Sequence, residues 1–186
     1  MSTFTQMMFQ NSNSPIMQLM VYFHDHLLVV LTLIISFIMY LSFMLIMNNI
    51  FNKNLSENQG MEFIWTIIPS VFLISLALPS MKILYIMEES NPSFSLKAMG
   101  HQWYWSYEYS DFNIEFDSYM KQSSGSLFRV LDVDNRAVVP CNSKLRVVVS
   151  AEDVIHSWAI PPLAMKMDAM PGRTNQMNTT MNDLSF

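Results

Sequence analysis

The sequence predicts a membrane protein of the α+β class, in which a hairpin of two transmembrane helices carries an extramembranous β-domain. Charged residues make up 13% of the 186 residues, about half the share of roughly 25% found in soluble domains. The charges are unevenly distributed, because residues 1–81 contain only Asp25, Lys53, Glu57 and Glu62. Beyond this part, short runs of β-type composition alternate with turn signals. The first part of the chain is therefore suited to lipid and the second part to water.

The first transmembrane helix is expected over residues 27–47, an uncharged stretch of 21 residues. A helix rises about 1.5 Å per residue, so this length spans a hydrocarbon core of roughly 30 Å. Residues 1–26 form an N-terminal segment that ends in three polar residues at the expected water interface. Because residues 1–23 contain no charged residue, they lack the basic start of a signal peptide and the Arg-rich face of a transit peptide.

The second transmembrane helix is expected over residues 62–84, after a polar loop at residues 48–61. Pro69 and Pro79 interrupt its apolar stretch. Proline is tolerated in a membrane helix where neighbouring helices supply partners for the freed backbone groups, so we expect this helix to pack against protein. Lys53 lies in the loop, whereas no Lys or Arg precedes the first helix; this bias favours a loop that faces the inner compartment.

The remaining residues, 91–186, are predicted to form an all-β sandwich or barrel, because short strand-like runs follow one another with turn signals between them. The expected strands are 95–99, 102–109, 127–133, 145–150 and 156–160.

The net charge of −5 argues against a nucleic-acid partner, because a phosphate backbone requires clustered Lys and Arg. An acidic exterior suits a basic protein partner through complementary potentials, although mild acidity can equally serve solubility alone. The single cysteine, Cys141, can form neither an intramolecular disulfide nor a multi-thiolate metal site. Its position in a turn favours a small buried side chain.

Three features could carry chemistry. In an aromatic block, strand alternation places Trp103, Trp105, Tyr107 and Tyr109 on one face; the block either packs a core or offers a surface for a partner or an electron. His156 at a strand end, before a Pro-Pro turn, is either a metal ligand or a structural histidine.

Glu62, at the start of the second helix, either interacts favourably with the helix N-terminus or serves as a proton-pathway carboxylate at the membrane face. Position alone does not separate these two roles.

Six strings occur in one order: EFIWTIIP (62–69), ALPS (77–80), GHQWYWSYEY (100–109), LDVDNR (131–136), EDVIHSW (152–158) and DAMPGRTNQ (168–176). This series resembles the mitochondrial cytochrome c oxidase subunit 2 family. The resemblance implies a cupredoxin-like β-barrel on a two-helix hairpin in the mitochondrial inner membrane. It places the β-domain and both termini in the intermembrane space and the loop 48–61 in the matrix.

The family resemblance also implies the activity and its residues. The chain would be a subunit of a proton-translocating oxidoreductase that accepts electrons from cytochrome c at a dinuclear copper centre and passes them to subunit 1 for oxygen reduction. His156 would be a copper ligand, Trp103 the residue at which electrons enter, and Glu62 the mouth of a proton path. The resemblance also implies acidic residues that dock cytochrome c, Glu108, Asp117, Glu152 and Asp153, and residues near the subunit 1 interface, Asp168 and Arg173.

The sequence departs from the family after the Pro-Gly-Arg string. There the family carries a loop of the pattern C-x-E-x-C-x-x-x-H-x-x-M, which supplies the thiolates of the copper centre. Residues up to Phe186 contain no such loop, so we expect an incomplete, C-terminally truncated barrel that offers one copper ligand.

This departure leaves several alternatives open. A partial sequence and a subunit completed by a second polypeptide are favoured over a copper-free structural or assembly subunit. A membrane-tethered binding module unrelated to respiration is remote.

Overall fold

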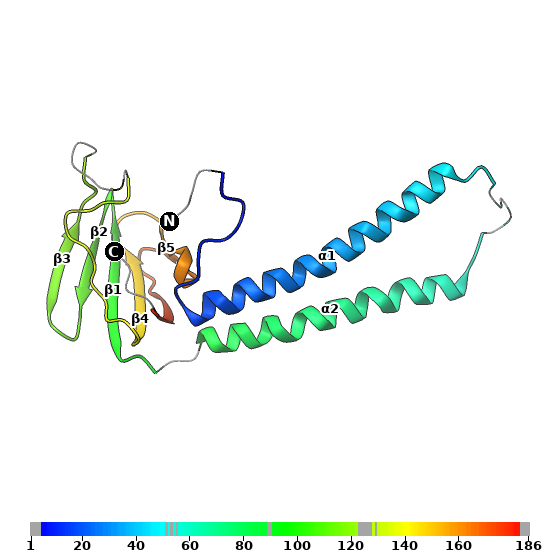
Figure 1. The fold of residues 1–186 in the computed structure, drawn as a ribbon. Helices are drawn as coiled ribbons and strands as arrows, with labels where there is room; N and C mark the ends of the chain where they lie inside the picture. Colours follow the sequence, from blue (N-terminus) through cyan, green and yellow to red (C-terminus); the bar gives the residue numbers. More distant parts are fainter. Residues whose placement is uncertain are drawn as a thin grey trace. The chain divides into compact units, whose positions relative to one another are not determined.

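The computed structural model describes residues 5–50, 52, 54, 56–88, 91–122, 128 and 130–182. The elements in chain order are α1 (Pro15–Met47), α2 (Gln59–Glu88), β1 (Phe94–His101), β2 (Tyr104–Tyr109), β3 (Ile114–Ser118), β4 (Lys144–Ala151), β5 (His156–Ile160), the 3-10 helix η1 (Pro161–Leu163), β6 (Met165–Ala169) and β7 (Asn175–Thr180) (Figure 1). They form two compact units, Met20–Leu84 and Met1–Leu19 together with Tyr85–Phe186.

The unit Met20–Leu84 consists of the apolar parts of α1 and α2 and their connection (Figure 1). Both helices are long and apolar enough to cross a membrane. They contain the two predicted stretches, and the fold class is confirmed. Lys53, on which the expected orientation of the loop depends, lies outside the described residues.

Helix α1 begins at Pro15, well before the predicted start at residue 27. Ser14 caps it, because its hydroxyl accepts a 3.0 Å hydrogen bond from the backbone N–H of Met17. Serine at the cap and proline at the first helical position are the preferred start of a helix. The uncharged stretch therefore predicted only the apolar part of α1, whereas Ser14 and Pro15 determine where the helix begins.

Helix α2 is capped in the same way by Asn58, whose side-chain oxygen accepts a 3.3 Å hydrogen bond from the N–H of Met61. Pro69 and Pro79 lie inside the helix and each removes one backbone donor. Hydroxyl groups add hydrogen bonds close to the first proline: Ser70 donates to the carbonyl of Thr66 over 2.8 Å.

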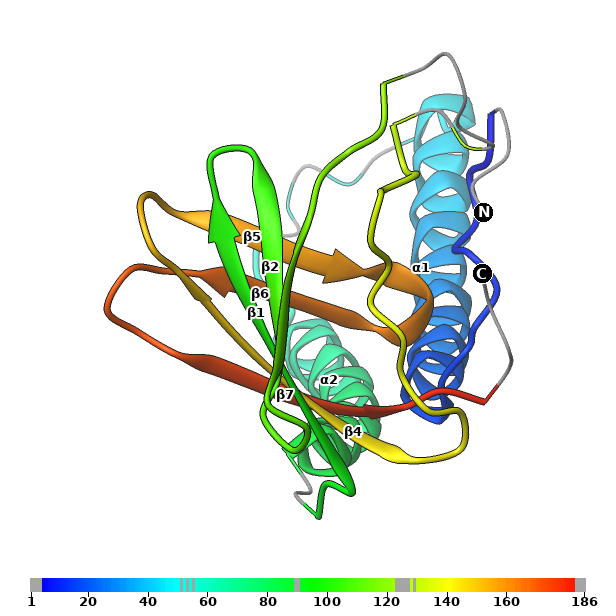
Figure 2. The same ribbon diagram turned by 90° about the vertical axis from the view of Figure 1, so that its left-hand side faces the viewer.

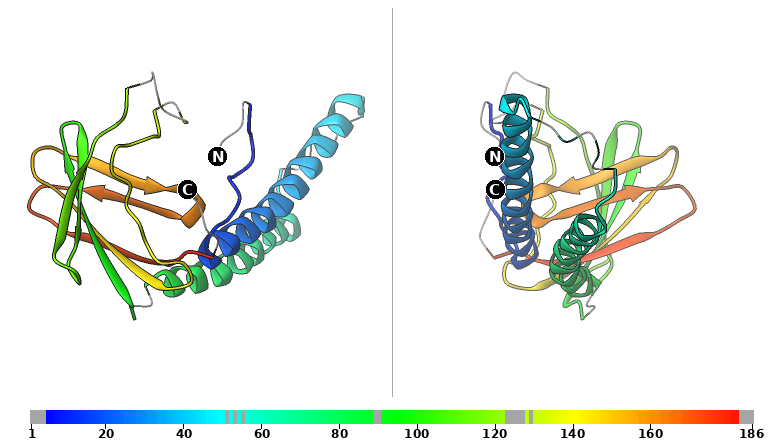
Figure 3. Two further views of the ribbon diagram at one scale, coloured as in Figure 1. Left: turned by 60° about the vertical axis from the view of Figure 1, so that its left-hand side comes forward. Right: turned by 90° about the vertical axis from the view of Figure 1, so that its right-hand side faces the viewer.

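The β-domain contains two sheets. The larger has the strand order β3-β2-β1-β4-β7, and β5 and β6 form a second, two-stranded sheet (Figure 2). Strands β1 and β4 run parallel, with Gly100 opposite Ala151, and the other pairs are antiparallel. The two-stranded sheet, in orange, is also visible in both views of Figure 3.

One hydrophobic core joins the two sheets. Alternate residues of β1 and β4 point into it, and β6 contributes in the same period-2 pattern. The buried apolar residues are Leu96, Ala98, Tyr109, Leu145, Val147, Val149, Ala151, Trp158, Leu163, Met165, Met167 and Ala169. Both sheets therefore contribute apolar side chains to the same core, and burial of these side chains stabilises the domain.

Hydrogen bonds hold the N-terminal segment against the β-domain. The backbone N–H of Asn13 donates to the carbonyl of Pro162 over 2.9 Å, and the N–H of Asn182 donates to the carbonyl of Asn13 over 3.0 Å. The hydroxyl of Ser14, which is 1% exposed, donates to the carbonyl of Leu163 over 3.1 Å. The residues just before α1 are thus part of the β-domain.

The strand predictions are confirmed in part. The runs 95–99, 145–150 and 156–160 lie in β1, β4 and β5, and β2 begins at Tyr104 rather than at residue 102. The expected strand 127–133 is wrong, since its described residues form turns and one isolated bridge between Val133 and Met120.

Strands β3, β6 and β7 were not predicted. The sequence of β7, NQMNTT, is mostly polar and carries no apolar alternation. It forms a strand because β4 pairs with its backbone along its whole length. Such pairing with a distant strand cannot be recognised from the local sequence.

Candidate functional site

The aromatic block divides between core and surface at the turn between β1 and β2. Trp105, Tyr107 and Tyr109 pack in or against the core, as alternation predicts. Trp103, expected on the same face, precedes the first residue of β2 and is 89% exposed. The block is therefore divided, with three aromatic side chains packed at the core and the indole of Trp103 exposed to solvent.

His156 is the first residue of β5 and packs beside the β1–β2 hairpin. Its imidazole contacts Trp105 in a T-shaped arrangement, with ring centroids 6.0 Å apart. Gly100 makes room for this ring, because a Cβ at that position would lie 2.9 Å from Cδ2 of His156, closer than carbon atoms normally approach. Only 17% of the His156 side chain is exposed.

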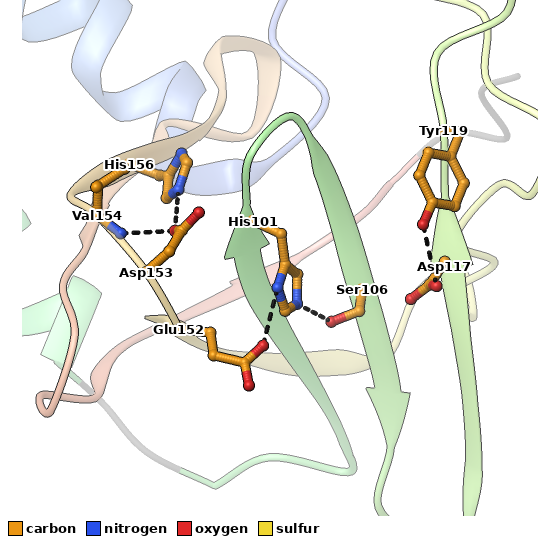
Figure 4. Close-up of polar contacts among 8 residues, drawn as sticks. All are labelled: His101, Ser106, Asp117, Tyr119, Glu152, Asp153, Val154 and His156. Carbon is orange, nitrogen blue, oxygen red and sulfur yellow. Dashed lines mark hydrogen bonds and ion pairs between the residues drawn. The ribbon is translucent and has the colours of Figure 1, made fainter.

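Asp153 orients the imidazole of His156. The carboxylate oxygen Oδ1 lies 2.7 Å from Nε2 (Figure 4). An ionised carboxylate only accepts hydrogen bonds, so Nε2 carries the hydrogen and the neutral ring has its lone pair on Nδ1. The hydrogen bond from His156, followed by that from the N–H of Val154, lowers the pKa of Asp153. This carboxylate–histidine pair is the arrangement that commonly fixes the tautomer of a metal-binding imidazole.

His101 is a functional candidate that was not predicted from the sequence. Its Nδ1 lies 3.0 Å from a carboxylate oxygen of Glu152, and its Nε2 lies 3.0 Å from the hydroxyl of Ser106 (Figure 4). The ring also stacks on Tyr104. Its place near Trp103 in the aromatic block could have indicated a role. Its polar partners could not be predicted from the sequence, because they lie on β2 and in the loop after β4.

The four predicted docking carboxylates all have partners on this chain, which limits how freely they could meet another protein. Glu108 pairs with Lys97 over 2.7 Å, and Asp117 accepts a long hydrogen bond of 3.4 Å from the hydroxyl of Tyr119. Glu152 and Asp153 pair with the histidines described above. Glu152 is nevertheless 71% exposed at its side chain, so it keeps most of its surface in water.

The described residues do not by themselves fit a dinuclear copper centre. Within the described part of the chain, no group of three or more His, Cys, Asp and Glu side chains could hold a metal ion. Cys141 precedes the start of β4, whereas His156 packs beside Gly100, opposite the end of β4. At about 3.3 Å per residue, the length of that strand separates them by roughly 20 Å.

Cys141 is engaged elsewhere. Its thiol is directed at the carbonyls of Met181 and Asn182, 3.5 and 3.3 Å away, and the residue is half-buried. These contacts agree with the structural role favoured by the sequence.

The other predicted residues occupy separate places. Glu62 lies in the first turn of α2 and is exposed. Asp168 is exposed on β6, and Arg173 is exposed in the turn between β6 and β7. Gly172 in that turn has a φ of 75°, a conformation that favours glycine. No contact among the described residues assigns a role to these three side chains, and their roles stay predictions.

Comparison with known proteins gives matches along nearly the whole chain. A family model described as "Cytochrome C oxidase subunit II, periplasmic domain" matches residues 94–185, and one described as the transmembrane domain of the same subunit matches residues 2–83. Cytochrome c oxidase subunit 2 of Drosophila melanogaster and that of Drosophila simulans are 52% and 51% identical over 187 residues, which cover 98% of this chain and 82% of each relative.

Among solved structures, the periplasmic domain of subunit II of cytochrome oxidase of Bradyrhizobium japonicum is 42% identical, with a TM-score of 0.49. The match covers 52% of this chain and 69% of that one.

Proposed function

Because the chain belongs to the cytochrome c oxidase subunit II family, we propose that its β-domain accepts electrons from cytochrome c and passes them to subunit 1 for oxygen reduction coupled to proton pumping. Family membership makes the chain a subunit of the respiratory oxidase, an oxidoreductase complex, with the other oxidase subunits as partners. The observation that carries the proposal is Trp103, whose indole is 89% exposed at the tip of the β1–β2 hairpin.

The surroundings of Trp103 suit a basic redox partner. Tryptophan is among the residue types that most often dominate the energy of protein interfaces. Glu152 follows β4, and its backbone N–H donates to the carbonyl of Gly100, three residues before Trp103. With a net charge of −5, the chain favours a positively charged partner and would steer its approach. Glu108, Asp117, Glu152 and Asp153 are the carboxylates that we propose for docking.

His156 is the residue that we propose as a copper ligand, through Nδ1, since Nε2 is held by Asp153. A copper centre would supply one-electron chemistry. Thiolate ligands for it would have to come from outside the described residues, either from further residues of the same subunit or from a second polypeptide. A copper-free structural or assembly subunit is the alternative.

Measuring the copper content of the assembled oxidase separates a copper-binding subunit from a copper-free one. If His156 binds copper, His156→Ala lowers the copper content of the complex. If the subunit is copper-free, His156→Ala leaves the copper content unchanged.

Two apolar helices and the family support a location in the mitochondrial inner membrane. We propose that the β-domain and both termini lie in the intermembrane space and that residues 48–61 face the matrix. Protease added to mitoplasts, whose outer membrane is removed, is expected to cleave the β-domain; cleavage only in inverted inner-membrane vesicles would contradict this orientation.

Three further residues keep roles proposed from the family alone. Glu62 would open a proton path, so Glu62→Gln is expected to lower the oxygen consumption of the assembled oxidase. Asp168 and Arg173 would lie at the interface with subunit 1, so their alanine variants are expected to lower the yield of the assembled complex.

The test of electron acceptance compares two exposed aromatic residues of the β-domain. Trp103→Ala is expected to reduce kcat/KM for cytochrome c by roughly 30-fold, since truncating a central aromatic anchor costs about 2 kcal/mol or more. Phe112, which is 64% exposed, is the matched control, and Phe112→Ala is expected to leave kcat/KM within about twofold. Equal effects of the two substitutions would remove the basis of the proposal.

A further inference from the structure

We propose that His101 is a positioning residue for electron acceptance: it holds the turn that presents Trp103 in a fixed place relative to the segment that carries His156. This inference rests on the proposed function, because it assigns a structural support to the residue at which electrons would enter. It concerns contacts inside the chain and is independent of which metal ligands come from elsewhere.

The first step is the position of His101 in the hairpin. It is the last residue of β1, and its partner across the β1–β2 ladder is Tyr104. The two rings stack with centroids 4.6 Å apart and planes 6° from parallel. Trp103 lies inside the turn that this stacked pair closes, and at 89% exposure it has little packing of its own. The geometry of the turn therefore depends on the pair beneath it.

The second step is that both nitrogens of His101 are engaged. The carboxylate of Glu152 can only accept, so Nδ1 carries a hydrogen and donates to it over 3.0 Å. In the neutral ring Nε2 then accepts from the hydroxyl of Ser106, also over 3.0 Å. The polar contacts with Glu152 and Ser106 (Figure 4) and the stacking on Tyr104 together leave the imidazole a single orientation.

The third step is what these contacts connect. Glu152 begins the loop that leads to His156, and its backbone N–H also donates to the carbonyl of Gly100. On the other side, Tyr104 stacks on Tyr119, just beyond β3, with centroids 4.5 Å apart. His101 thus connects the turn that contains Trp103 to the loop before His156. Tyr104 connects the same turn to the residue just beyond β3.

Loss of this tie would matter because the rate of a reaction between fixed groups is sensitive to their placement, and a displacement of 1 Å can cost about 10²-fold. The binding of a partner depends less on this placement, because it needs the indole of Trp103 on the surface, where a displaced turn still presents it, and not at one fixed distance from His156. The expected signature is therefore a lower kcat with little change in KM.

Ser106 offers the cleanest variant. It is buried, with 6% of its surface exposed, so it offers almost no surface to a docked protein, and its removal acts on electron acceptance through the interior. Ser106→Ala in the assembled oxidase is expected to lower kcat for cytochrome c oxidation about tenfold, with KM within about twofold. Ser106→Thr, which keeps the hydroxyl, is expected to restore most of the lost kcat.

The matched control is Ser118→Ala. Ser118 is equally buried at 6% exposure, lies on the neighbouring strand β3, and donates to the carbonyl of Asn135 rather than to His101. It is expected to leave kcat and KM unchanged. A fall in kcat equal to that of Ser106→Ala would mean that loss of any buried hydroxyl slows the enzyme, and would overturn the inference.

A second measurement does not depend on activity. With 5-fluorotryptophan incorporated, the fluorine resonance of Trp103, assigned by its loss in Trp103→Phe, is expected to shift or broaden in Ser106→Ala and in His101→Phe. The second variant keeps a stacking ring and removes both polar contacts. An unchanged Trp103 resonance in both variants would overturn the inference.

The two proposals fail differently. If Trp103→Ala leaves kcat/KM unchanged, electron acceptance at Trp103 is wrong, whereas the fluorine spectra still decide whether His101 positions the turn. If Trp103→Ala slows the enzyme and Ser106→Ala changes neither kcat nor the resonance, the proposed function stands and the positioning role of His101 is wrong.

Discussion

Replacing Gly100 by alanine tests how tightly His156 is held against β1. The added Cβ would lie 2.9, 3.0 and 3.1 Å from Cδ2, Cγ and Cβ of His156. Carbon atoms attract one another best at about 3.5–4.0 Å, so the imidazole or the strand has to retreat by roughly 0.5–1 Å. Overpacking of this kind typically costs about 1–3 kcal/mol.

A smaller gain offsets part of that cost. Glycine loses more conformational freedom on folding than alanine, and the substitution recovers about 0.4–1 kcal/mol where the backbone is compatible. The φ angle of Gly100 is not in the left-handed region. We therefore expect Gly100→Ala to lower the free energy of unfolding by about 1–2 kcal/mol, measured by urea denaturation of the full chain in nanodiscs.

A double-mutant cycle identifies the ring as the cause. His156→Ala removes the two ring atoms nearest to the new methyl group, so the cost of Gly100→Ala is expected to fall by about 1 kcal/mol in that background. Gly60→Ala is the control, because its Cβ meets only the side-chain oxygen of Asn58 at an ordinary 3.5 Å. Additive effects of Gly100→Ala and His156→Ala, within about 0.5 kcal/mol, would refute the packing described for His156.

Three further results are expected. Leu163→Ala, at a core position 1% exposed, should cost about 2–5 kcal/mol in urea denaturation; a loss below about 1 kcal/mol would contradict its burial. Ser14→Ala should cost about 1–2 kcal/mol, because it removes the cap of α1 and the bond to the Leu163 carbonyl; an unchanged midpoint would contradict both. Hydrogen bonds from the N–H groups of Tyr119 and Asn135 lower the pKa of Asp134, so its contribution to stability is complete above the unfolded-state value of about 3.9 and is lost as the pH falls through the lowered pKa. The difference in Tm between wild type and Asp134→Asn should shrink over that window; a constant difference would contradict the assignment.

The helices were predictable because lipid imposes one solution on an apolar stretch. Backbone groups in a bilayer must be satisfied within the segment, so two uncharged stretches of this length indicate two helices. Their ends depend on local capping by Ser14 and Asn58, and the absence of charged residues carries no information about such caps. Both caps could have been read from the sequence, since Ser-Pro and Asn before a helix are local signals.

The β-domain was predictable where a strand carries its own pattern. The apolar runs of β1, β4 and β5 face the core and were recognised. Strand β7 is polar and pairs with β4 through its backbone. It forms because β4 is there to pair with it, and its own sequence does not indicate a strand. The expected strand 127–133 had apolar residues but no ladder partner among the described residues beyond one bridge at Val133.

The sequence by itself determined the lipid-spanning part, the β-domain that follows, the family, and the residue types at the candidate site, because these depend on composition, local periodicity and ordered strings. Only the tertiary structure decided which side chains meet. Gly100 and His101 meet Glu152 and His156, some fifty residues later, because β1 runs parallel to β4 in one register. Asp153 and His156 form a local pair, three residues apart, whereas that register brings Nδ1 of His101 to the carboxylate of Glu152, far along the chain. Such pairings depend on strand register and side-chain packing over long sequence separations, and no local pattern in the sequence contains them.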